Sequence, residues 1–251
     1  MSKPSPEYLL IFDFDDTLVD CNAPYDIADK LQNKENAAKY KYMDEFVSFH
    51  DAFLFLFERK NALSDDWDNF NKIVTHVKFI RGMEELLNYL KDKKVNKNNF
   101  DVIMDSGDVD YILRKNLEKI RCDGLIKTYL CYHTKPTPDN PTTFLELIND
   151  LNNLTTCDDC NPNLCKTHEL KEFLKKEENN SYKTKIVICD GGNDFCLAKN
   201  LGKNDILFCR KNYGLYKKLY GKGLSDKIKA KIILWDDGVD LMKEIKGILE
   251  K

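Results

Sequence analysis

Short apolar runs recur along the 251-residue chain, and stretches with helical periodicity separate several of them. The runs that we interpret as buried strands cover residues 8–14, 100–104, 129–132, 185–189, 205–208 and 231–235. Helices are predicted over residues 82–92 and 107–119. This alternation predicts an α/β fold with a parallel sheet covered by helices, in which ligands bind at the carboxyl ends of the strands.

The segment from residue 21 to residue 79 differs, because it shows no strand pattern. Apolar side chains recur in it at helical spacing, namely Phe46, Phe49, Phe53, Phe55, Leu56 and Phe57. We predict a small helical cap over 21–79, inserted after the first strand of a core that comprises 1–20 and 80–251. We interpret the aromatic stripe as packing within this cap, in preference to a substrate-binding surface.

The composition narrows the classes of function. A hydrophobic content of 42% is enough for a packed core, and a net charge of −3 is atypical of a nucleic-acid-binding protein. No apolar run approaches the ~20 residues of a membrane span, and the first residues lack the apolar segment of a secretory signal. The nine cysteines are an odd number, which favours free thiols and a cytoplasmic location. The oligomeric state stays open.

Three aspartates lie where the first predicted strand ends, in the stretch IFDFDDTLVD at residues 11–20. Asp13 and Asp15 are two residues apart, so an extended chain places them on one face. One carboxylate can then attack an electrophile while the other transfers protons, and both can approach a hard cation. Asp16 and Thr17 follow directly. The alternative is a solvated turn, since surface turns often contain a lone DxD, but here the motif follows an apolar strand and continues as DxDDTLVD.

A second acidic turn, Asp190-Gly-Gly-Asn-Asp194, follows another predicted strand. Asp190 is placed to bind a metal directly, with Asp194 close by, although such a run is also typical of an ordinary turn. Ser106 also follows an apolar run. Because the carboxyl ends of parallel strands share one edge, Asp13, Ser106 and Asp190 are expected to converge.

Together these motifs resemble the haloacid dehalogenase (HAD) superfamily of aspartyl-phosphate phosphatases, whose core is a Rossmann-like parallel sheet. The first family motif, DxDxT, is matched by residues 13–17, and the second by Ser106. Lys166 is our choice for the third, with Lys183 and Lys185 as the next candidates. Asp190 and Asp194 match the fourth.

One branch of that superfamily contains the phosphoethanolamine/phosphocholine phosphatase and the pyridoxal phosphate phosphatase. It carries a C-x-x-C-P-x-N-x-C-K segment, and residues 157–166 read CDDCNPNLCK. Two departures are visible: Asn161 precedes Pro162, and Cys189 stands where a glycine usually precedes the aspartate of the fourth motif. Neither removes a charge that the reaction needs.

The resemblance implies a Mg²⁺-dependent phosphatase that acts on a small phosphorylated metabolite. The implied metal ligands are Asp13, the backbone carbonyl of Asp15 and Asp190, with Asp194 beside them. Asp13 would form an aspartyl-phosphate, and Asp15 would act as general acid and then general base. Lys166 would neutralise the transferring group.

The implied phosphoryl contacts are Ser106, Gly107 and the backbone at Asp16 and Thr17. A phosphotransferase or a pyrophosphatase on the same site is the nearer alternative. A non-catalytic binding protein with this fold is a further one, which the filled catalytic positions argue against.

The amine-phosphate phosphatases of this branch hold the cationic head of the substrate with two acidic residues. Pro24 and Gly107 occupy those positions here, so neither carries charge. Asp105, Asp108 or Asp26 could compensate from a neighbouring position. We therefore predict that pyridoxal 5′-phosphate is hydrolysed in preference to phosphoethanolamine or phosphocholine.

The cysteines of the 157–166 segment permit two interpretations. Cys157, Cys160, Cys165 and His168 have spacings that could bind zinc as a Cys₃His site. Alternatively, the thiols pack around the loop that presents Lys166. We favour packing, because the zinc interpretation rests on spacing alone.

Overall fold

The computed structural model of the protein describes residues 6–35, 55–97, 99–148, 157, 159–160, 164–176 and 182–250. Its centre is a six-stranded sheet in the order β3-β2-β1-β6-β7-β8, with every neighbouring pair parallel. The strands are β1 (Tyr8–Phe12), β2 (Phe100–Val109), β3 (Ile126–Tyr132), β6 (Thr184–Cys189), β7 (Ile206–Arg210) and β8 (Lys231–Trp235). All six predicted runs form strands, and the predicted parallel α/β fold is confirmed.

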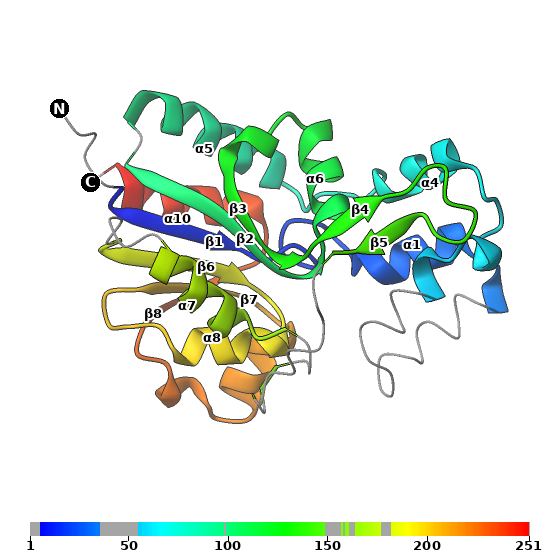
Figure 1. Ribbon diagram of the computed structural model, residues 1–251. Coiled ribbons are helices and arrows are strands. Elements are labelled where there is room, and N and C mark those ends of the chain that lie inside the picture. Colours follow the sequence, from blue (N-terminus) through cyan, green and yellow to red (C-terminus); the bar gives the residue numbers. More distant parts are fainter. Residues whose placement is uncertain are drawn as a thin grey trace.

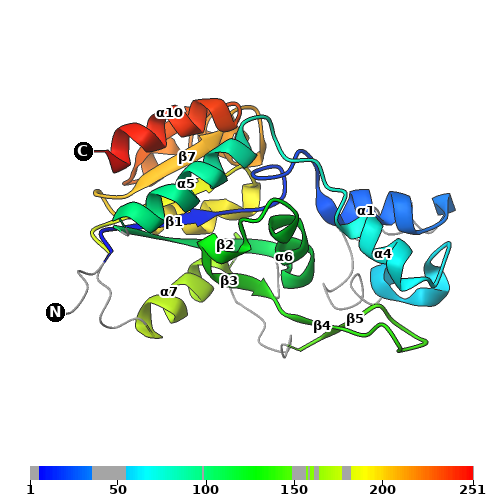
Figure 2. The same ribbon diagram turned by 90° about the horizontal axis from the view of Figure 1, so that it is seen from above.

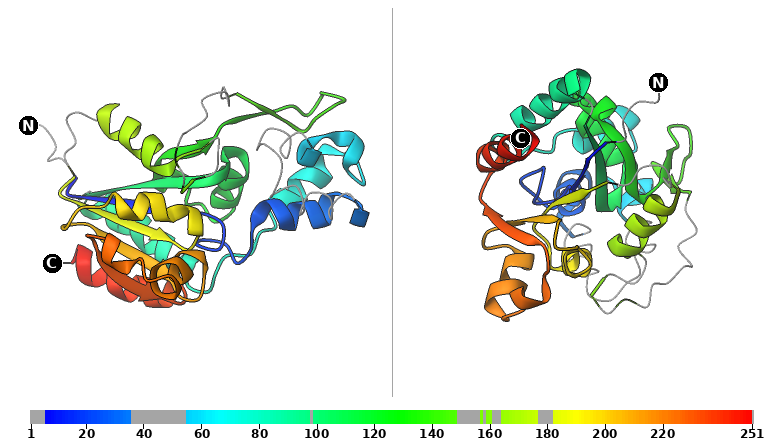
Figure 3. Two further views of the ribbon diagram at one scale, coloured as in Figure 1. Left: turned by 90° about the horizontal axis from the view of Figure 1, so that it is seen from below. Right: turned by 90° about the vertical axis from the view of Figure 1, so that its left-hand side faces the viewer.

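Helices cover both faces of this sheet (Figures 1 and 2). One face carries α5 (Met83–Lys97), α6 (Asp110–Lys119) and α10 (Gly238–Leu249), and the other carries α7 (Lys166–Lys176), α8 (Phe195–Lys199) and α9 (Gly214–Tyr216). Alternate side chains of β1 enter the two cores, since Leu10 packs on the first side and Leu9 on the second. The right-hand view of Figure 3 shows the helices on either side of the strands.

Both predicted helices form, with shifted ends. Helix α5 continues to Lys97, past the predicted end at residue 92, although its last turns are rich in lysine and asparagine. Lys91 and Lys94 donate hydrogen bonds from there to the backbone carbonyls of Arg121 and Leu125, which attaches this polar end to the core. Helix α6 begins only at Asp110, because β2 continues to Val109.

The strand order reverses direction between β1 and β6, which is where a crevice forms in a sheet of this topology. Phe12 of β1 is paired with Ile188 of β6, and the Asp13 N–H donates to the Ile188 carbonyl at 3.0 Å. The turns that follow these two strands, at Asp13 and Asp190, therefore lie next to one another.

Helices α1 (Ala23–Leu31) and α4 (Trp67–Val74) lie beyond the carboxyl ends of the strands (Figure 1; Figure 3, left). Leu56 and Phe57 of the aromatic stripe are buried, in agreement with packing. Phe46, Phe49 and Phe53 lie outside the described residues. The division into a core and a cap stays a prediction.

A two-stranded hairpin, β4 (Thr134–Pro136) and β5 (Leu145–Leu147), reaches out beside these helices (Figure 1). The sequence division placed it in the core. However, the Phe144 N–H donates to the Phe57 carbonyl at 2.9 Å, and the ring of Phe144 stacks on that of Phe70 with centroids 4.4 Å apart. The hairpin thus packs with the cap segment, which the strand and helix patterns did not predict.

Two further observations concern membrane spans and disulfides. Among the helices of the described ranges, none combines the length and the apolar character needed to cross a bilayer. All nine cysteines are free thiols.

Candidate active site

Three aspartates and one lysine gather at the switch point of the sheet, and we call this group the acidic centre. Carboxylate oxygens of Asp13, Asp190 and Asp194 all lie within 4.8 Å of one another, and all three side chains are buried. Lys166 enters from the first turn of α7, with its Nζ 2.7 Å from Asp13 Oδ2 and 2.6 Å from Asp194 Oδ1. The structure therefore brings together the residues chosen for the first, third and fourth motifs.

The turn after β6 has local reasons for its shape. A Cβ on Gly191 would lie 2.3 Å from Asn193 Oδ1, so a larger residue there would displace the Asn193 side chain. The Gly191 N–H donates to Asp194 Oδ2 at 2.8 Å, which turns the carboxylate back toward the strand end. The Thr17 hydroxyl donates to Asp190 Oδ1 at 2.9 Å and so links the turns that follow β1 and β6.

The electrostatics of the acidic centre are unbalanced. Burial raises the pKa of Asp13 to about 6, despite the opposing charge of Lys166, and burial with the charge of Asp13 raises that of Asp190 to about 8. Burial alone would lower the pKa of Lys166, but the charges of Asp13 and Asp194 hold it well above its usual value. Three ionised carboxylates around one ammonium leave an excess of two negative charges. A hard divalent cation with oxygen ligands, such as Mg²⁺, fits this donor set.

Asp15 is held by the first residue of α1. Its Oδ1 accepts a hydrogen bond from the Ala23 N–H at 2.9 Å. Burial, followed by the charge of Asp108, raises the pKa of Asp15 well above its usual range. A carboxyl group that retains its proton near neutral pH can donate it, which is the property a general acid requires.

Asp16 and Thr17 stabilise the turn that follows β1. The Asp16 backbone is left-handed, with φ of 49°, and its N–H donates to the Cys21 carbonyl at 3.1 Å. The Thr17 N–H donates to the Phe14 carbonyl at 3.3 Å. Both amides thus hydrogen-bond within the protein, and their role as phosphoryl donors stays a prediction.

Arg210, at the end of β7, is a residue that the sequence reasoning missed. Its Nη1 donates to the Asp16 carbonyl at 2.6 Å, and its guanidinium lies over the ring of Tyr213, 4.1 Å from the centroid. Arg210 therefore holds the strained backbone at Asp16. The available signal was a basic residue at the end of an apolar strand.

The second motif differs in detail from the prediction. Ser106 lies within β2, where the pairing with β3 shifts register, and not after the strand. Its hydroxyl accepts a hydrogen bond from the Asp108 N–H at 3.2 Å, and within the described residues it makes no hydrogen bond to Asp13 or Lys166. A Cβ on Gly107 would meet no atom within 4 Å, so there is space beside it.

Asp105 interacts with the charges of the acidic centre, and the sequence reasoning did not predict this role. It is 1% exposed, and neither carboxylate oxygen has a hydrogen-bond partner within the described residues. Burial raises its pKa well above the usual range, with Lys166 opposing and Asp13 adding to the rise. Asp108 is similar, because its Oδ2 also has no hydrogen-bond partner within the described residues and burial raises its pKa to about 7. An acidic residue beside the motif serine was the available signal.

Three other candidates are engaged elsewhere. Lys183 pairs with Glu7 at 3.3 Å and Lys185 with Asp205 at 3.0 Å, near the amino end of β6, so Lys166 is the lysine of the acidic centre. Asp26 pairs with Lys30 on α1.

The known proteins that this chain resembles are phosphatases. Residues 8–249 match the model of the Putative Phosphatase family. The chain belongs to this family. It is 27% identical to the pyridoxal phosphate phosphatase of Homo sapiens, over 96% of this chain and 98% of that protein. It is 24% identical to the phosphoethanolamine/phosphocholine phosphatase of Gallus gallus, over 100% of this chain and 91% of that protein.

Solved structures show the same fold. Phosphoserine phosphatase in its apo form superposes with a TM-score of 0.55 at 20% identity, covering 96% of this chain and 97% of that one. A HAD family hydrolase of Salmonella enterica superposes with a TM-score of 0.58 at 16% identity, covering 95% of this chain and 72% of that one. This member of the Putative Phosphatase family is therefore a HAD-type phosphoric monoester hydrolase, as its motifs predicted.

Proposed function

We propose that the protein is a Mg²⁺-dependent phosphatase that hydrolyses a small phosphorylated metabolite through an aspartyl-phosphate on Asp13. The observation that carries this proposal is the acidic centre itself. Buried carboxylates from the ends of two adjacent strands share one buried lysine, and a divalent cation would balance their charges when all of them are ionised.

Asp13 and Asp190, with the backbone carbonyl of Asp15, would hold the cation. When bound, Mg²⁺ supplies the positive charge that lets an anionic phosphate approach a carboxylate. Asp194 has both oxygens engaged, one by Lys166 and one by the Gly191 N–H, so its part is to fix the lysine and the turn.

The reaction would proceed in two steps, formation and then hydrolysis of the aspartyl-phosphate. A carboxylate oxygen of Asp13 attacks phosphorus, the bond from phosphorus to the ester oxygen breaks, and the proton of Asp15 passes to that oxygen. In the second step ionised Asp15 takes a proton from water, the water oxygen attacks phosphorus, and the bond to Asp13 breaks to release phosphate. The raised pKa of Asp15 suits the first step, because it favours the protonated form that can donate.

Lys166 stabilises charge on the transferring group, because its ammonium already contacts the nucleophile. The open space at Gly107 suits the phosphoryl oxygens, and Ser106 beside it supplies a hydroxyl. Asp105, whose raised pKa favours the protonated form and whose oxygens have no hydrogen-bond partner within the described residues, would be a further donor.

We propose pyridoxal 5′-phosphate as the first-choice substrate. The support is the likeness to the pyridoxal phosphate phosphatases and the uncharged residues at Pro24 and Gly107. Asp26 is paired with Lys30 and cannot easily replace the missing charge. The buried rings of Phe70 and Phe144 pack on each other, so they stabilise the cap region and give no support to ring binding.

Phosphoethanolamine and phosphocholine form the second candidate class, and one observation favours them. Asp108 is buried, one of its oxygens has no hydrogen-bond partner within the described residues, and its charge acts on Asp15. The primary ammonium of phosphoethanolamine would donate a hydrogen bond to that oxygen, whereas the quaternary ammonium of phosphocholine, which has no N–H, would only offset its charge.

The deciding experiment measures kcat/KM in parallel on pyridoxal 5′-phosphate, phosphoethanolamine and phosphocholine with Mg²⁺. The proposal expects the highest value for the ring phosphate, and a preference for either amine phosphate would overturn it. Turnover of p-nitrophenyl phosphate tests the phosphatase assignment separately. Transfer of phosphate to added alcohols or to a second phosphate, in place of water, would indicate the phosphotransferase alternative. The free thiols support our proposal of a cytoplasmic enzyme.

A further inference from the structure

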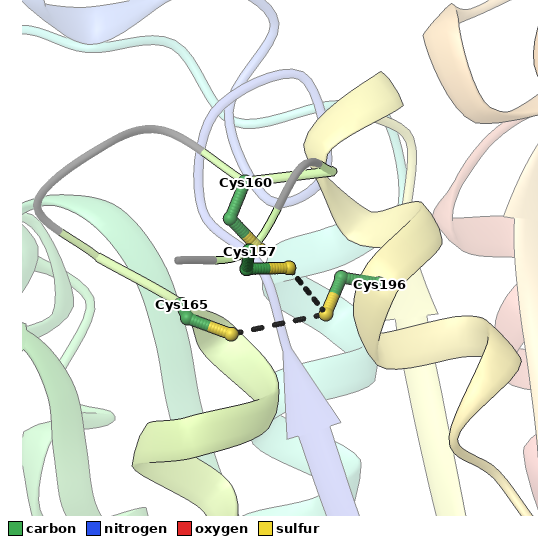
Figure 4. Close-up of side chains that lie close together, drawn as sticks. All are labelled: Cys157, Cys160, Cys165 and Cys196. Carbon is green, nitrogen blue, oxygen red and sulfur yellow. Dashed lines mark hydrogen bonds between the residues drawn. The ribbon is translucent and has the colours of Figure 1, made fainter. Parts of the chain in front are cut away.

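Four cysteines gather beside the acidic centre, and the proposed reaction uses none of them. This cysteine cluster consists of Cys157, Cys160, Cys165 and Cys196 (Figure 4). The first two come from the segment before α7, Cys165 directly precedes that helix, and Cys196 lies on α8. The four sulfur atoms point toward one another and all lie within 4.8 Å of each other.

The spacing of the sulfurs suits a single shared ion. Cys157 Sγ lies 3.3 Å and Cys165 Sγ 3.8 Å from Cys196 Sγ. In a tetrahedral zinc site with Zn–S bonds of about 2.3 Å, the sulfurs are about 3.8 Å apart. An iron–sulfur cluster would hold its cysteines farther apart, because inorganic sulfides lie between the metal atoms.

Neighbouring groups are arranged as around a metal-bound thiolate. The Thr167 hydroxyl lies 3.1 Å from Cys196 Sγ, and the backbone N–H of Asp159 hydrogen-bonds to Cys157. The first two cysteines are spaced C-x₂-C, and the Cys160 N–H donates to the Cys157 carbonyl at 3.2 Å, which closes a tight turn between the two ligands. Lys199 pairs with Asp159 and brings positive charge to the same loop.

We propose that Cys157, Cys160, Cys165 and Cys196 bind one Zn²⁺ ion as a closed structural site. The fourth ligand is Cys196 and not His168, the residue that the sequence suggested, because His168 is exposed on α7 and lies outside the cluster. With four protein sulfurs the site has no position for substrate, so its role is structural.

The position of the site gives it a consequence for the acidic centre. Cys165 is adjacent to Lys166, and Cys196 is two residues from Asp194. A zinc ion would therefore tie together the two segments whose Lys166–Asp194 contact measures 2.6 Å. Cys165 directly precedes α7, so metal–sulfur bonds there would fix the start of the helix that carries Lys166.

The test measures metal content in the purified full chain by elemental analysis, together with cobalt substitution. We expect close to one zinc per chain, and tetrahedral thiolate bands in the visible spectrum when Co²⁺ replaces it. Both readouts are independent of turnover, so they stay informative even if the phosphatase assignment fails.

Variants assign the ligands. In Cys157→Ala and Cys196→Ala, zinc should pass readily to a colorimetric chelator that the wild type resists. His168→Ala and Cys122→Ala are the matched controls and should retain the metal, since the first removes the alternative ligand and the second a buried cysteine outside the cluster. Cys157 is only partly buried, so its variant is informative if Cys196→Ala fails to fold.

Three outcomes would overturn the proposal. The first is a chain that binds no zinc even after reconstitution under reducing conditions. The second is zinc content that survives in both cysteine variants or falls in His168→Ala. The third is a cluster that holds something other than zinc. Elemental analysis would then give one equivalent of iron, or the mass of the chain would be lower by two hydrogens because a disulfide has formed within the cluster.

Discussion

The acidic centre and the cysteine cluster use the same two segments of the chain but present opposite kinds of ligand. At the start of α7, Cys165 faces the cluster while Lys166 faces the aspartates. After β6, Asp194 at the end of the turn faces the lysine, and Cys196 on α8 faces the other sulfurs. Successive residues of a helical turn point in different directions, so one short segment can serve two sites. Carboxylates suit a hard, exchangeable ion, and thiolates suit a fixed one.

The largest effect that separates the two sites is expected from Asp13→Asn. An amide cannot form the acyl-phosphate, so turnover of p-nitrophenyl phosphate should fall by on the order of 10⁴-fold or more. Zinc content should be unchanged, because Asp13 does not touch the cysteine cluster. A variant that retained a tenth of wild-type turnover would exclude Asp13 as the nucleophile.

Brief chelation should also distinguish the acidic centre from the cysteine cluster. We expect EDTA to abolish activity and Mg²⁺ to restore it, while zinc stays bound on the same timescale. Ca²⁺ should support little turnover, because its larger and looser coordination shell does not reproduce the geometry that Mg²⁺ demands. The measurement is phosphate release and metal content on the same sample. Full activity in excess chelator would remove the metal from the mechanism.

A smaller loss is expected from Lys166→Ala. Removing a cation that stabilises transition-state charge should lower kcat by ~10²-fold. Lys183→Ala is the matched control, because Lys183 pairs with Glu7 away from the site and should leave kcat unchanged. Steady-state kinetics of the two variants decide the point, and near-normal kcat in Lys166→Ala would move the third motif elsewhere.

The acidic centre should also make stability depend on pH. With pKa values of about 6 for Asp13 and about 8 for Asp190, the native protein holds protons that the unfolded chain has released above pH ~4. The free energy of unfolding of the metal-free protein should therefore fall as pH rises from about 5 to 8. Mg²⁺ replaces those protons, so its stabilising effect should grow over the same window. Thermal melts with and without Mg²⁺ measure this, and a stabilisation independent of pH would contradict it.

The smallest effect is expected from Asp105→Asn, which imitates the protonated carboxyl. The melting temperature of the metal-free variant should match that of the wild type at low pH and exceed it at high pH, because one buried charge is gone. One pKa unit corresponds to about 1.4 kcal/mol, or about 3–6 °C for a chain of this size. Lower stability at high pH would show that ionised Asp105 has a partner that we have not identified.

The sequence alone determined the frame of the molecule and most of the acidic centre. Six apolar runs became the six strands, and Asp13 and Asp190 followed strand ends, because period and composition are local properties. Lys166 was chosen through a motif resemblance, and its contacts with Asp13 and Asp194 agree with that choice.

Only the tertiary structure decided the rest. Whether Asp105 or Ser106 faces the acidic centre depends on the pleat of β2 and on the register shift near its end, which a sequence does not reveal. Cys196 joins the cysteine cluster across 31 residues from Cys165, and the Arg210 guanidinium reaches Asp16 across 194. Such contacts arise because the parallel sheet brings distant strand ends to one edge, and that placement is a property of the whole fold.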